Sequence, residues 1–201
     1  MPAIVFLEAS GQYDWLRWRW TSWLGKGIVE GLDEPSAERL LQALVRCPEL
    51  EHNCEYMVAS VAKKFPVTVL RFVGERIRLA KSDAAPADYE AVPFEPHMLR
   101  EALQAQLAKS PDVVLEEAQA WFRTDCLRFP YGGARMVVSI FPFVEGEMFT
   151  HLMKIATEGG RGELAFLVAL MEAYNGQQFL YPILRALIAR LEPDDDLLKV
   201  I

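Results

Sequence analysis

The sequence predicts an all-α protein whose helices pair as antiparallel hairpins and stack as a short right-handed solenoid. Apolar positions recur at three- and four-residue spacing along almost the whole chain, which is the periodicity of amphipathic helices. Proline and glycine clusters divide the 201 residues into segments of helical length joined by short turns. Apolar residues make up 52% of the chain. A single hairpin cannot bury so much apolar surface alone, so stacking of successive hairpins is expected.

The expected helices follow this punctuation in order. The first covers about residues 13–24 and ends at a Gly-Lys-Gly turn. The second begins after Asp33 and Glu34, with Pro35 in its first turn, where a missing N–H costs little. The following helices are expected at residues 52–64, 66–81, 96–109, 111–123, 134–141, 145–157, 163–174 and 177–191. Residues 130–133 (Pro-Tyr-Gly-Gly) are expected to break the chain between two helices.

The whole chain, residues 1–201, is expected to form one repeat domain. Residues 1–33 would form an aromatic N-terminal cap or interface, residues 34–191 the stacked hairpins, and residues 192–201 an acidic C-terminal helix. The one long connection covers residues 82–95, and its Tyr89 and Phe94 are expected to dock onto the edge of the solenoid.

Two turns repeat one another most clearly. Residues 65–70 (FPVTVL) and 110–115 (SPDVVL) each place proline at the start of a helix. With these turns, the runs KSPDVVLEEAQAWF and LAFLVALMEAYNGQQFLYPILRALIARL resemble the HEAT-like branch of α-helical repeats, over roughly residues 35–191. The usual Asp–Arg ladder of that family is largely missing, since Pro111 is followed by Asp112 but Pro66 by Val67. The resemblance implies a divergent array that acts as a scaffold or recognition surface.

Charge and composition limit the function further. The net charge of −7 and a pI near 5.1 argue against a general nucleic-acid binder. No uncharged apolar run approaches the roughly 20 residues of a spanning helix, and the N-terminus lacks the basic start of a signal peptide. Three irregularly spaced cysteines are typical of reduced core residues. We therefore expect a cytoplasmic protein without a membrane span.

Motifs of known enzymes and cofactor sites do not occur in the sequence. The best metal candidate is Cys47, His52 and Cys54, which would suit zinc, but a fourth ligand is lacking and both cysteines fit as small buried residues. The acidic run that ends at Asp196 is expected to cap the terminal helix. We expect no catalytic residue, no metal and no cofactor.

One enzymatic alternative rests on a match to HEAT-like DNA glycosylases, which use a concave surface with tryptophan, arginine and a catalytic aspartate. Trp121 and Asp125 lie four residues apart, with Arg123 and Arg128 nearby. The acidic pI opposes nucleic-acid binding, and Trp121 also fits a core face together with Ala118.

The first candidate for a binding surface is a cluster of positive charge between residues 53 and 81. This region carries six basic residues and two acidic ones, a net of +4: Lys63, Lys64, Arg71, Arg76, Arg78 and Lys81 against Glu55 and Glu75. Lys64, Arg71 and Arg78 are seven residues apart and define a basic stripe. The stripe is either a groove for an acidic partner or a solvated face with Glu75 between its arginines.

The second candidate is the aromatic N-terminal helix. Trp15, Trp18 and Arg19 fall outside the arc that would pack on the next helix. This second face would contact a partner protein, a second copy of the chain, or the preceding residues 1–10 folded back. Because solenoid ends are normally polar, the chain would be a piece of a larger array or form a homodimer through this end.

These observations together favour a non-enzymatic protein-interaction module with an unknown protein partner. It would be a scaffold, or a regulatory or sensing part of a larger system whose catalytic portion is on another polypeptide. The alternative is a HEAT-like nucleic-acid-binding protein or glycosylase that uses the basic stripe with Trp121 and Asp125.

Overall fold

The computed structural model describes residues 27, 29–50, 52–80, 82–92, 97–121, 131–175 and 177–199. Within these residues every regular element is an α-helix or a short 3₁₀-helix, and no strand occurs. The prediction of an all-α protein is confirmed. None of the described helices combines the length and the hydropathy that crossing a membrane requires.

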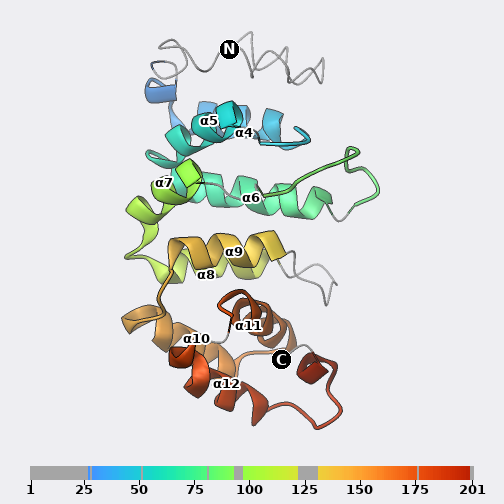
Figure 1. Cartoon of the computed structure of the whole chain (residues 1–201). Coiled ribbons are helices and arrows are strands. Elements are labelled where there is room, and N and C mark those ends of the chain that lie inside the picture. The colour runs from blue at the N-terminus through green and yellow to red at the C-terminus, as the bar shows by residue number, and fades with distance from the viewer. Residues whose placement is uncertain are drawn as a thin grey trace. The chain divides into compact units, whose positions relative to one another are not determined.

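The chain divides into two compact units, Met1–Ala108 and Lys109–Ile201 (Figure 1). In the described part of the first unit lie α4 (Glu34–Leu44), α5 (His52–Ala62), α6 (Pro66–Ala80) and α7 (His97–Leu107). The second unit contains α8 (Pro111–Ala120), α9 (Tyr131–Ile140), α10 (Gly146–Glu158), α11 (Arg161–Ala173), η1 (Gln178–Leu180), α12 (Tyr181–Ile188) and η2 (Asp196–Lys199).

Local sequence signals explain where several helices begin. The carboxylate of Asp33 accepts a hydrogen bond from the Ser36 N–H at 3.0 Å and caps α4. Pro66 opens α6 and Pro111 opens α8, so both of the repeated proline turns form as predicted.

The core of the first unit forms where α5 packs against α6 and α7, and α4 against α6. Leu70 and Ile77 of α6 and Leu99 and Leu103 of α7 are fully buried. These residues recur at the helical spacing of the apolar pattern. Hydrophobic burial is therefore the main force that holds these helices together.

A fully buried arginine on α6 departs from this apolar pattern. The side chain of Arg76 has no exposed surface. Its guanidinium donates to the carbonyl oxygens of Leu44 at 3.0 Å, Val45 at 3.0 Å and Cys47 at 2.7 Å. These carbonyls belong to the C-terminal end of α4 and the turn after it, where the helix dipole favours a cation. Burial lowers the pKa of Arg76 below its usual value, but arginine stays charged.

The same guanidinium holds the long loop at residues 82–92 against the first unit. It also donates to the carbonyl oxygens of Glu90 and, at 2.9 Å, Ala91, while its carbon lies 4.6 Å from the centre of the Tyr89 ring. The Tyr89 hydroxyl in turn donates to the Val45 carbonyl. The loop turns back beside α6 (Figure 1). Docking of Tyr89 is therefore confirmed, and Phe94 lies outside the described residues.

A second buried polar side chain in the first unit caps a helix that lies far from it in the sequence. The Glu55 side chain on α5 is 7% exposed, and its Oε1 accepts hydrogen bonds from the N–H groups of Met98 at 2.8 Å and Leu99 at 3.1 Å. These N–H groups belong to the first turn of α7, and the N–H groups of a first turn have no acceptor within their own helix. Glu55 thus replaces the local capping residue that α7 would otherwise need.

Replacing Glu55 with alanine is expected to lower the free energy of unfolding by about 1–2 kcal/mol, because one buried and one partly buried N–H group lose their acceptor. Glu55→Gln, which keeps one carbonyl oxygen, should lose less. Urea unfolding followed by circular dichroism measures both changes. Glu38→Ala on the exposed face of α4 is the control, with an expected change within about 0.5 kcal/mol. An equal loss in the Glu55 and Glu38 variants would contradict the capping role.

The core of the second unit is built by α9 on α11 and by α10 on α8, α11 and α12. Phe166 of α11 and Ile183 of α12 are fully buried. Tyr174 is also buried, and its hydroxyl donates to the Phe141 carbonyl at 2.6 Å. Burial raises the pKa of Tyr174 above its usual value, so this hydroxyl remains a donor at physiological pH.

Two predicted boundaries in the second unit are wrong. The predicted break at residues 130–133 fails because α9 already begins at Tyr131. Its two glycines stand in the first turn, where their entropic cost is offset by burial of Ala134 and Val137. The predicted single helix at 177–191 is split into η1 and α12. Pro182 lacks the N–H that a continuous helix would need there.

The acidic run after α12 has the capping role that we expected. Asp195 Oδ1 accepts the Leu197 N–H at 2.9 Å at the start of η2. Both carboxylate oxygens of Asp195 also accept from the Arg161 guanidinium at the start of α11. This pairing lowers the pKa of Asp195 below its usual value.

Candidate functional site

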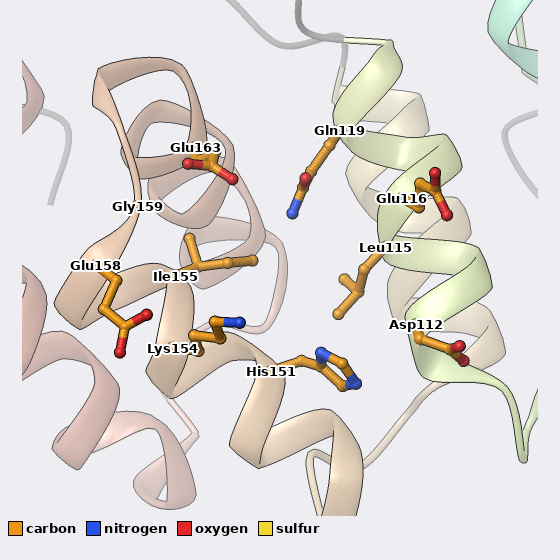
Figure 2. A pocket seen from close by; sticks show the side chains of 10 residues that line it. All are labelled: Asp112, Leu115, Glu116, Gln119, His151, Lys154, Ile155, Glu158, Gly159 and Glu163. Atoms are coloured by element: carbon orange, nitrogen blue, oxygen red, sulfur yellow. The ribbon is translucent and has the colours of Figure 1, made fainter.

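The second unit carries a groove of about 350 Å³, which we name the α8–α10 groove. Ten residues line it: Asp112, Leu115, Glu116 and Gln119 of α8, His151, Lys154, Ile155 and Glu158 of α10, and Gly159 and Glu163 at the turn into α11. Figure 2 shows Leu115 and Gln119 extending from α8 toward α10, while His151, Lys154 and Ile155 extend toward α8.

Helical periodicity places four side chains of each helix on one wall of this groove. The α8 residues are spaced at positions i, i+3, i+4 and i+7 from Asp112, and the α10 residues have the same spacing from His151. The apolar residue is the second of the four on α8, Leu115, and the third of the four on α10, Ile155. Leu115 is 3% exposed and Ile155 is 8% exposed, so the two form an apolar base between polar edges.

The end of the groove is formed by a tight turn between α10 and α11. Gly159 donates its N–H to the Ile155 carbonyl at 2.9 Å, and its own carbonyl accepts from the Arg190 guanidinium at 2.9 Å. The next N–H, of Gly160, donates to Glu163 Oε2 at 2.7 Å, which is half of a capping box. A Cβ atom on Gly159 would lie 2.5 Å from the Ile155 carbonyl oxygen. Only glycine allows this turn without a shift of the backbone.

The electrostatic character of the groove is acidic. Four carboxylates line it, those of Asp112, Glu116, Glu158 and Glu163, against one ammonium group, that of Lys154. All five of these side chains are exposed, whereas His151 and Gln119 are half-buried. The groove therefore attracts cations and repels phosphate-bearing ligands.

The sequence does not predict this groove. The signal available in the sequence was the matching polar–apolar spacing of α8 and α10. Their juxtaposition is not encoded locally, because the two helices are separated by α9.

The three residues of the basic stripe do not all lie on one helix. Arg71 and Arg78 are exposed on α6. Lys64 lies in the turn before α6, where its ammonium group donates to the backbone carbonyls of Leu32 at 2.6 Å and Glu30 at 3.4 Å. Arg76, counted among the six cations of this region, is buried. Glu55, one of its two acids, is buried as well, so burial does not change the net charge of this region. Binding by the stripe stays a prediction.

Three of the predicted contact residues, Trp15, Trp18 and Arg19, lie outside the described residues. The homodimer through the N-terminal helix therefore stays a prediction. Asp125 also lies outside the described part of the chain. Trp121 is 3% exposed, in agreement with the core-face interpretation, and its Nε1 finds no acceptor among the described residues.

The structure describes the side chains of two of the three residues in the zinc candidate. Cys47 and Cys54 are both buried, and the Cys47 thiol donates to the Glu49 carbonyl at 3.2 Å. The side chain of His52 lies outside what the structure describes. In the described ranges, no three histidine, cysteine, aspartate or glutamate side chains are grouped so that they could hold a metal ion.

Comparisons with known proteins found no relative of this chain. No protein-family model matches the chain, and no curated protein and no solved structure is significantly similar to it.

Proposed function

We propose that this chain is a non-enzymatic protein-interaction module of the HEAT-like repeat type, acting as a scaffold or as a regulatory or sensing part of a larger system. The observation that carries the proposal is the α8–α10 groove. It has an apolar base and charged edges, like many protein-recognition surfaces. It lies on helices rather than on loops, so its walls are rigid.

The packing of alternate helices supports the solenoid part of the proposal. In the first unit α4 contacts α6 and α5 contacts α7, and in the second unit α8 contacts α10, α9 contacts α11, and α10 contacts α12. Contact between a helix and the one two positions further on is what stacked antiparallel hairpins produce. Such arrays act through extended surfaces rather than through a single deep pocket.

Photo-crosslinking in a lysate of the native host tests the proposal. A photoreactive amino acid replaces Gln119 in the groove, or, as a control of the same residue type, the exposed Gln106 of α7. We expect one protein to be crosslinked at position 119 and to be strongly depleted at position 106. No adduct, or the same adducts at both positions, would contradict an interaction site at this groove.

A further inference from the structure

The α8–α10 groove combines two features that one kind of side chain satisfies together. Its base is apolar, formed by Leu115 and Ile155, and its edges carry four carboxylates. Lysine and arginine have an aliphatic stem that packs on apolar surface and a charged head that stays near carboxylates and water. A volume of about 350 Å³ lies at the low end of the range for small-molecule pockets and is large enough for a few side chains of a longer segment.

We propose that the groove binds a lysine- and arginine-bearing peptide segment of a partner protein. This inference rests on the proposed function, because it names the chemistry of the partner at the same groove. The basic side chains would extend along Leu115 and Ile155, with their heads near Glu116 on one wall and Glu158 on the other.

The arrangement of the carboxylates favours an extended polycation over a single ion. Asp112 and Glu116 lie one turn apart on α8, whereas Glu158 and Glu163 lie on the opposite wall and at its end. No three of the described carboxylate, histidine or cysteine side chains converge on one point as a metal ion would need. Charges spaced along both walls match charges spaced along a peptide. An anionic partner such as nucleic acid would be repelled.

Removing the positive charge of Lys154 should change the peptide affinity in the opposite direction from removing a carboxylate. It is the one ammonium group among the residues that line the groove, and its amine points into it (Figure 2). A cationic segment must bind despite this charge, so its removal in Lys154→Gln should raise the affinity. An acidic partner would instead lose affinity on the same change.

The experiment measures fluorescence anisotropy of a labelled synthetic peptide in which Lys-Leu-Arg-Ala repeats, with the full-length protein. Two variants probe the groove: Glu116→Gln with Glu158→Gln, and Lys154→Gln. Glu172→Gln with Glu192→Gln removes the same charge from exposed positions of the second unit outside the groove. Circular dichroism confirms that every variant is folded.

We expect the groove pair Glu116→Gln with Glu158→Gln to weaken peptide binding by about fivefold, and Lys154→Gln to strengthen it by about twofold, since exposed charges contribute modestly. The control pair should change affinity by less than about twofold. A peptide with glutamate in place of both basic residues should not bind.

Four results would overturn the inference: no binding of the basic peptide, equal weakening by the groove and control pairs, weaker binding in Lys154→Gln, or groove-dependent binding of spermine without the peptide. If the peptide fails while the crosslink at position 119 forms, the partner chemistry is wrong and the interaction module stands. If the peptide binds through the groove but no crosslink forms in the lysate, the chemistry stands and the cellular role falls.

Discussion

Arg76→Met is expected to lower the free energy of unfolding by about 3–5 kcal/mol, because several buried carbonyl oxygens would each lose a hydrogen bond to a charged donor, worth about 1.5–3 kcal/mol. The methionine would fill most of the volume, but six carbonyl oxygens would lose their shared donor: those of Leu44, Val45, Cys47, Pro48, Glu90 and Ala91. Three of these oxygens keep a second donor, since the Cys47 N–H donates to Leu44, the Tyr89 hydroxyl to Val45 and the Glu90 N–H to Pro48. The loss therefore comes mainly from the other three, because a buried acceptor that loses its donor carries a desolvation penalty. Urea unfolding followed by circular dichroism measures the loss.

Two further variants separate this role from helix propensity and from charge alone. Arg78→Met changes the same residue type at an exposed position of α6 and should stay within about 0.5 kcal/mol of the parent protein. Arg76→Lys keeps the positive charge but lacks the planar fork that reaches several carbonyls at once, so its stability should fall between those of the parent and of Arg76→Met. If Arg76→Met and Arg78→Met lost equal stability, the hydrogen bonds from Arg76 to the backbone carbonyls would make no specific contribution to stability.

Gly159→Ala should have the second largest effect, about 2 kcal/mol of lost stability, which lies in the usual range for overpacking a close-packed site. The added Cβ would approach the Ile155 carbonyl oxygen to 2.5 Å, and this oxygen is part of the backbone of α10 and cannot rotate away. The φ angle of Gly159 is −61°, which alanine adopts readily. Steric contact is therefore the whole reason for the loss. Thermal unfolding followed by circular dichroism measures it.

The chain offers a matched control three residues along. A Cβ on Gly162 in the first turn of α11 would meet nothing within 4 Å. Gly162→Ala should therefore stabilise the protein by about 0.4–1 kcal/mol, because alanine loses less backbone entropy on folding. The two substitutions are chemically identical and should shift the midpoint of unfolding in opposite directions. Shifts of the same sign and size would contradict the assignment of Gly159 as a contact-limited position.

Residues whose signal is local were predicted well. Pro66 and Pro111 open helices because a fixed φ and a missing N–H fit the first turn regardless of the surroundings. Helix positions follow from the spacing of apolar side chains, which is also local. The break predicted at residues 130–133 was wrong because glycine propensity is weak beside burial of the following turns.

Nonlocal features were not predictable in the same way. Arg76 looked like one of several surface cations, because nothing in its own helix shows that the carbonyls of residues 44, 45 and 47 converge on it. The groove could not be predicted for the same reason. The spacing of Asp112 to Gln119 and of His151 to Glu158 could be read from the sequence, but which helix α8 faces depends on the path of the chain through α9.

The cap that Glu55 provides has a consequence for the order of folding. The first turn of α7 takes its acceptor from a residue 43 positions earlier in the chain, so the segment His97–Leu107 by itself lacks this stabilisation. Helices of 11 residues are marginal in water on their own. We therefore expect α7 to become helical only after α5 is formed and in place. Contacts over such separations are slow to close, which makes this docking step a candidate for the rate-limiting event in assembly of the first unit.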